Sequence, residues 1–157
     1  MLTIRPATLA DTDGILALLR QVNNVHENTR PDLFIKDKTK YTAAELAALL
    51  ADDSRPIFVA VDEGERVLGY AFCVFQSHEK NYNLRDVLTL YVDDLCVEET
   101  ARGTGIGTAL FEHVRAFARD RGVYNLTLNV WDKNEAAQAF YNHLGFHIQK
   151  YGMELFV

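Results

Sequence analysis

The sequence predicts an α/β protein built on one central, mostly antiparallel sheet with about four flanking helices. Apolar stretches of strand length alternate with segments whose apolar residues recur at helical spacing. Two of the strand-like stretches are joined by a short turn at residues 62–66, which is typical of a hairpin and hence of antiparallel pairing. The length of 157 residues suits one domain, which we expect to span residues 1–157.

The strands are predicted from alternating or continuous apolar runs that turn residues bound on either side. They are expected at residues 2–5, 57–61, 67–75, 87–97 and 126–130, with one or two more between 147 and 156. The last of these are apolar enough to pair with a second subunit, so a homodimer is a possible assembly.

The helices are predicted from single apolar stripes and from the signals at their ends. They are expected from Asp11 or Thr12 through Val25, and over residues 43–51, 106–121 and 134–144. Thr42 and Glu45 form a capping box at the start of the second helix, and Gly122 and Gly145 end the last two.

A long polar segment, residues 26–41, separates the first two helices and contains only a few apolar residues. Connections of this length are uncommon and often functional. We interpret the segment as a lid over a substrate, with a plain surface loop as the alternative.

Three glycines, Gly103, Gly105 and Gly107, follow the strand at 87–97 and run directly into a helix. Glycines let the backbone come close to a ligand, and the first N–H groups of a helix have no intrahelical partner. Such a loop is an anion site, with phosphate as the expected anion. No lysine follows as in the P-loop, and the glycine spacing differs from the dinucleotide fingerprint.

The composition excludes several classes of function. A net charge of −6 argues against nucleic acid as the main partner, and no apolar run approaches the ~20 residues of a membrane span. The start of the chain lacks a signal-peptide pattern, and Cys73 and Cys96 both lie in expected strands, so we expect a cytoplasmic protein. The five histidines show no metal-ligand spacing, and no metal is expected.

Two motifs resemble those of the GNAT superfamily of acetyl-CoA-dependent N-acetyltransferases. The first is Arg102-x-x-Gly105-x-Gly107, and the second has the spacing N-x-x-A-x-x-x-Y-x-x-x-G-F from Asn134 to Phe146. Asn134 and Tyr141 are seven residues apart and would share one helix face. The order of elements also resembles the GNAT fold over nearly the whole chain.

The resemblance implies a role for each matching residue. The CoA pyrophosphate would be held by the loop residues Arg102, Gly103, Thr104, Gly105, Ile106, Gly107 and Thr108. The pantetheine arm would pair with the backbone of Leu95, Cys96 and Val97, with the Cys96 N–H polarising the thioester carbonyl. Asn134 would contact the pantetheine beside the small Ala137, and Tyr141 would protonate the leaving thiolate. An amine would attack the thioester directly, without a covalent enzyme intermediate.

The chain departs from the family pattern at the position of the general base. Some relatives place a glutamate five residues before the motif asparagine, whereas this chain has Asn129 there. Asp93 and Asp94 are the candidates, and because neighbouring strand residues face opposite ways, at most one is expected to face the cleft. We favour Asp94 because it is nearer the expected thioester. The Cys96 thiol could in principle be a nucleophile, but its place inside a strand favours a structural role.

Three interpretations remain open at this point. The leading one is acetyl transfer from acetyl-CoA to a primary amine, and a short match around residues 91–97 resembles the polyamine-acetylating branch. The second is a non-catalytic acyl-CoA-binding or sensing module of the same fold. The third is a protein-modifying enzyme whose peptide lies between residues 26–41 and 76–86.

Overall fold

A computed structural model describes residues 1–80 and 82–157. Its centre is one five-stranded sheet in the order β1-β2-β3-β4-β5. The strands are β1 (Thr3–Pro6), β2 (Ile57–Val61), β3 (Val67–Gln76), β4 (Thr89–Val97) and β5 (Asn125–Thr127). Strands β1 to β4 pair antiparallel and β5 pairs parallel with β4, so the mostly antiparallel sheet predicted from the sequence is confirmed.

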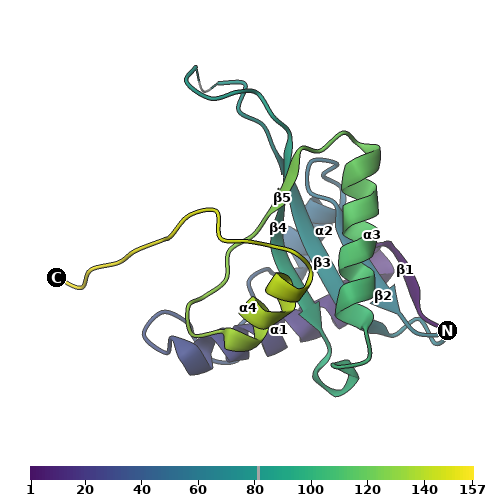
Figure 1. Ribbon diagram of the computed structural model, residues 1–157. Coiled ribbons are helices and arrows are strands. Elements are labelled where there is room, and N and C mark those ends of the chain that lie inside the picture. The colour runs from purple at the N-terminus through teal and green to yellow at the C-terminus, as the bar shows by residue number, and fades with distance from the viewer. Residues whose placement is uncertain (81) are drawn as a thin grey trace.

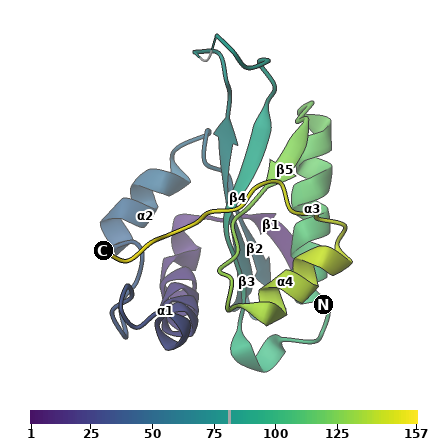
Figure 2. The same cartoon turned by 60° about the vertical axis from the view of Figure 1, so that its left-hand side comes forward.

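In the described part of the chain, four α-helices flank the sheet in two layers. They are α1 (Thr12–Thr29), α2 (Ala43–Leu50), α3 (Ile106–Asp120) and α4 (Glu135–His143), with short 3-10 turns at Leu9–Asp11 and Glu99–Ala101. Helices α1 and α2 lie on one side of the sheet and α3 and α4 on the other, as Figure 2 shows. The predicted capping box is present, since the Thr42 hydroxyl accepts from the Glu45 N–H at 3.2 Å.

Each helical layer covers its own apolar cluster. The cluster under α1 and α2 contains Ile15, Leu18, Leu19, Leu46, Val59, Val61, Tyr70, Phe72 and Cys96. The cluster under α3 contains Phe58, Ala60, Ala71, Cys73, Leu90, Val92, Ile106, Leu110 and Val114. Alternate residues of β2 and β3 fall into different clusters, because successive side chains of a strand point to opposite faces.

Strand β4 carries a bulge at its centre. Phe72 pairs with Asp94 whereas Cys73 pairs with Val92, so Asp93 is the extra residue on β4. Strand β5 pairs with β4 only from Thr89 to Tyr91. Among the residues that the structure describes, none forms a strand beside the β4 backbone beyond this point, and the sheet is open there.

The C-terminal segment departs from the prediction. No strand is found among residues 144–157; instead the segment leaves the end of α4 and runs away from the sheet (Figure 1). A strand exists only where its backbone meets a partner. The predicted strands at 147–156 were therefore wrong for this chain by itself, although the segment keeps its apolar side chains.

Two other boundaries differ from expectation by three residues or more. Strand β5 ends at Thr127 rather than at residue 130, and α1 continues to Thr29, so His26 is helical. Across the described residues, no helix is both long and apolar enough to cross a membrane.

Candidate active site

The glycine loop has the geometry of an anion cradle. Gly103 and Gly105 have φ of 76° and 87°, a region that favours glycine, and Gly105 is the N-cap of α3. A Cβ placed on either would meet nothing within 4 Å, so the space in front of the loop is open. The first N–H groups of α3 point from a helix start toward this space.

Gly107 is needed for a different reason. A Cβ there would lie 3.2 Å from Phe140 Cζ, so the absence of a side chain lets α3 approach α4 closely. The spacing of the motif therefore combines a ligand-facing turn with a helix–helix contact.

Arg102 connects the loop to the end of β4. Its Nε donates a 3.1 Å hydrogen bond to the carbonyl oxygen of Val97. The guanidinium is therefore held beside the open β4 edge and next to the glycine loop, where it can meet an anionic ligand.

The backbone register decides which N–H groups face the open edge. The backbone N–H of Glu98 donates to Leu68 O at 2.8 Å, so this N–H points toward β3. Because N–H directions alternate along an antiparallel strand, the Cys96 N–H also points to β3, where Cys96 pairs with Tyr70. The prediction that Cys96 supplies the free N–H is thus corrected, and the N–H groups of Leu95 and Val97 face the open edge.

The Cys96 thiol lies in the core. Its residue is only 5% exposed and it packs in the cluster under α1 and α2. Burial, with the nearby Asp94 charge, raises the thiol pKa to about 12. A thiol this far from ionisation is a poor nucleophile, which agrees with the structural role favoured from the sequence.

Asp94 lies where β4 faces α1 and α2. The Tyr70 hydroxyl donates a 2.8 Å hydrogen bond to Asp94 Oδ2, and Tyr70 is itself fully buried. Burial raises the pKa of Asp94 to about 6, although the bond from Tyr70 and the charge of Lys40 oppose the shift. A carboxylate with such a pKa is suited to act as a general base near neutral pH.

Asp93 faces the same side as Asp94, contrary to the prediction that at most one of them could. Its Oδ2 accepts from Lys40 Nζ at 2.7 Å and from the Tyr41 hydroxyl at 3.3 Å. Tyr41 stacks on Phe72, a member of the cluster under α1 and α2. The bulge interrupts the alternation of β4, which brings both carboxylates to this face.

Tyr141 lies on α4 between two aromatic rings. Its ring meets those of Phe140 and Phe146 in edge-to-face contacts at 5.1 Å and 5.6 Å. Burial raises the pKa of Tyr141, and the charge of Asp94 adds to the shift. The phenol therefore keeps its proton at neutral pH, and Asp94 is close enough to influence it.

Asn134 precedes α4 instead of lying within it. Its Oδ1 accepts from the Ala137 N–H at 3.2 Å, which makes Asn134 the N-cap. This bond leaves the amide NH2 as the group that can meet a ligand.

The segment between α1 and α2 lies against the same region. Phe34 packs edge-on to Trp131 at 5.7 Å and beside His26 at 5.1 Å. Arg30 bridges Asp32 and Glu154, and a hollow of about 530 Å³ lies beside it. Further hollow-lining residues are Thr29, Pro31, Trp131, Asp132, Lys133 and Phe156.

Two residues of the site were missed by sequence reasoning. Tyr70 lies within an apolar strand, where a core position is expected. The one available signal was its hydroxyl group, which usually has a hydrogen-bond partner when it is buried. Lys40 lay in a polar loop among other lysines and carried no signal. Within the described part of the chain, no group of three potential ligands could hold a metal ion.

Comparison with known proteins places the chain in a family. The model of the acetyltransferase (GNAT) family matches residues 21–146. Thialysine N-epsilon-acetyltransferase of Bos taurus is 30% identical over 152 residues, which is 90% of this chain and 82% of that protein. The peptidyl-lysine N-acetyltransferase YjaB of Escherichia coli is 30% identical over 93 residues, covering 59% of this chain and 50% of that protein.

The solved structures give the same result. A tetramutant of BH1408 from Bacillus halodurans superposes with a TM-score of 0.93 at 32% identity and covers 99% of both chains. An acetyltransferase from Trypanosoma brucei shares the fold, with a TM-score of 0.73 at 20% identity. The chain is therefore an acyltransferase that belongs to the acetyltransferase (GNAT) family.

Proposed function

We propose that this enzyme moves an acetyl group from acetyl-CoA to a primary alkyl amine, which attacks the thioester directly. The observation that carries the proposal is the open edge of β4. It lies between the glycine loop and α4, with Asp94 on the strand and Tyr141 on the helix. Each chemical requirement of the reaction then has a matching group.

The residues present fit an acyl-CoA. The space beyond Gly103 and Gly105 can admit a pyrophosphate against the N–H groups that begin α3, over residues 103–108. Arg102 lies beside it as a cation. The open edge at Leu95 and Val97 can pair with the amides of a pantetheine arm, as an added strand would. Asn134 offers its amide NH2 from the start of α4, next to Ala137. When bound, acetyl-CoA supplies an activated acyl group on a thiolate leaving group.

The catalytic roles follow from position and protonation state. The N–H groups at the open edge stabilise the oxyanion, an effect of ~3–4 kcal/mol per donor in other enzymes. Of the two, the N–H of Leu95 is nearer to Asp94 than that of Val97. Asp94 accepts, directly or through water, the proton that the acceptor ammonium must lose before its neutral nitrogen attacks the thioester. Tyr141 keeps its proton and donates it to the departing thiolate, for which general acid catalysis contributes ~10²–10⁴-fold.

The acceptor is proposed from charge and from the relatives. Asp93 and Asp94 bring two carboxylates to one face, which suits an acceptor that arrives as an ammonium ion. The relatives named above are a thialysine N-epsilon-acetyltransferase and a peptidyl-lysine N-acetyltransferase, so both a small amine and a peptide amine stay as acceptor classes.

The experiment is a thiol-release assay with acetyl-CoA against polyamines, amino acids including lysine analogues, aminoglycosides and lysine peptides. Wild type and Tyr141→Phe are run side by side, and acetyl-CoA binding is measured by calorimetry for both. We expect amine-dependent release that falls in the variant without a change in affinity. Binding of acetyl-CoA with no thiol release in the presence of any of these amines would contradict the proposed reaction.

We also propose a homodimer that uses the C-terminal segment. Its side chains Tyr151, Met153, Leu155 and Phe156 are 77–93% exposed, which is unusual for apolar groups in one stretch. Leu155→Glu should convert a dimer to a monomer in light scattering, and a monomeric wild type would refute the idea. A cytoplasmic location is proposed from the two free, buried cysteines.

A further inference from the structure

The segment between α1 and α2 brings a primary amine of its own into the candidate site. Lys40 Nζ lies 2.7 Å from Asp93 Oδ2. The Asp93 side chain is only 18% exposed, while that of Lys40 is 49% exposed. An alkylammonium therefore already sits on one of the two carboxylates that we assign to the acceptor.

The position of Lys40 is set by its surroundings. The next residue, Tyr41, stacks on Phe72 at 5.8 Å and shares the Asp93 carboxylate. Earlier in the segment, the backbone oxygen of Ile35 accepts a 2.7 Å hydrogen bond from Asn23 Nδ2 of α1. Asp37 likewise forms hydrogen bonds with Asn24 of α1. The segment is thus tied to α1 on one side and to the sheet on the other.

The charge of Lys40 reaches the catalytic groups. Burial opposes its charge, but the hydrogen bond and charge of Asp93 outweigh burial and raise the pKa of Lys40. The Lys40 charge in turn lowers the pKa of Asp94, whose own charge raises the pKa of Tyr141. The amine, the carboxylates and the phenol therefore lie within the range of one another's charges.

We propose that Lys40 is itself an acetyl acceptor: when no free amine is present, the site acetylates Lys40 Nζ of the same molecule. The flexible four-carbon stem of lysine allows Nζ to move from Asp93 along β4 toward the open edge. The proposal rests on the proposed function, since it uses the same donor and the same Asp94 and Tyr141.

The step balances as an ordinary acyl transfer. The Lys40 ammonium first loses a proton to Asp94 or water, and the neutral Nζ forms a bond to the thioester carbonyl carbon. The carbon–sulfur bond breaks, and the departing thiolate takes a proton from Tyr141. The nitrogen loses its second proton, which restores the Tyr141 hydroxyl directly or through water, and Asp94 releases the first proton to solvent. The products are an acetyl-lysine, free CoA thiol and one proton released to solvent. The amide is neutral, so it no longer pairs with Asp93.

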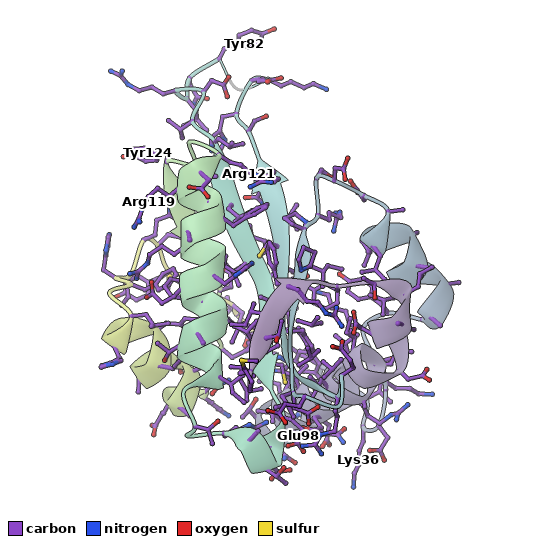
Figure 3. The ribbon with its side chains drawn as sticks, turned by 90° about the vertical axis from the view of Figure 1, so that its right-hand side faces the viewer. Lys36, Tyr82, Glu98, Arg119, Arg121 and Tyr124 are labelled. Atoms are coloured by element: carbon purple, nitrogen blue, oxygen red, sulfur yellow. The ribbon has the colours of Figure 1, made fainter. Side chains whose placement is uncertain are left out.

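The test is mass spectrometry of the full chain after incubation with acetyl-CoA and no added amine. Lys36 and Lys38 of the same segment are exposed, and Lys36 points away from the body (Figure 3), so they report chemical acetylation in the same sample. We expect one addition of about 42 Da that maps to Lys40, with a rate constant unchanged by tenfold dilution. It should be lost in Lys40→Arg and Gly105→Asp and kept in Lys36→Arg.

Three results would overturn the proposal. They are no addition at all, acetylation spread equally over the three lysines and persisting in Gly105→Asp, or a rate that falls tenfold on dilution because one molecule modifies another. The melting temperature of Lys40→Arg, measured without acetyl-CoA, verifies that the variant is folded. Free amines are assayed on the same preparation: if they are acetylated while Lys40 is not, only this inference fails and the proposed function stands.

Discussion

Replacing Asp94 by asparagine should stabilise the fold at neutral pH, because Asp94 is ionised there at a cost. Its pKa is raised from 3.8 to about 6 in the native state, so the folded protein holds this proton more tightly than the unfolded chain does. Stability is then lost as the pH rises through this range, and the full shift corresponds to about 3 kcal/mol. Asparagine keeps an oxygen that can accept from Tyr70 and has no charge to bury.

The measurement is urea unfolding of wild type and Asp94→Asn at pH 4 and pH 7.5. Because Asp94 keeps some solvent contact, we expect the stability difference to move in favour of the variant by about 1–3 kcal/mol between these pH values. At neutral pH this is a rise in melting temperature of roughly 2–4 °C per kcal/mol. Asp93→Asn is the control: it removes the pair with Lys40, worth ~0–1 kcal/mol, but keeps the buried Asp94 carboxylate, so most of the pH dependence of stability should remain. A difference that stays constant with pH would refute the reasoning.

Three further predictions address the loop, the acid and the sheet. Gly105→Asp should abolish acetyl-CoA binding in calorimetry. Gly122→Asp is the control, because Gly122 has a φ of 67°, so the variant carries similar backbone strain at the other end of α3 and should still bind acetyl-CoA. Equal loss of binding in both variants would assign the effect to folding. Tyr141→Phe should lower kcat by ~10²-fold or more at unchanged acetyl-CoA affinity, and unchanged kcat would remove Tyr141 from the acid role. Gly69→Ala should lower the free energy of unfolding in urea by ~1–3 kcal/mol, because its Cβ would lie 2.9 Å from the Cys96 carbonyl oxygen. An unchanged free energy of unfolding would mean that β3 and β4 can move apart at this point without cost.

Local patterns accounted for most of the elements. Helix α2 begins at its capping box, β2 spans the predicted residues, and α3 begins at the residue after Gly105. These features depend on side chains within a few positions of each other, so the linear sequence contains the whole cause. The C-terminal strands failed because a strand needs a partner, and the hydrophobicity of residues 147–156 does not specify one.

The candidate site shows the same division. The sequence by itself determined the glycine loop, the Asn134 and Tyr141 motif and the family, because these depend on residue type and spacing. Only the tertiary structure decided that Asp93 and Asp94 share a face, that Leu95 and Val97 present the free N–H groups, and that Lys40 and Tyr70 belong to the site. The physical reason is that a one-residue bulge and the pairing register set side-chain and N–H directions, and both arise from contacts between strands distant in sequence.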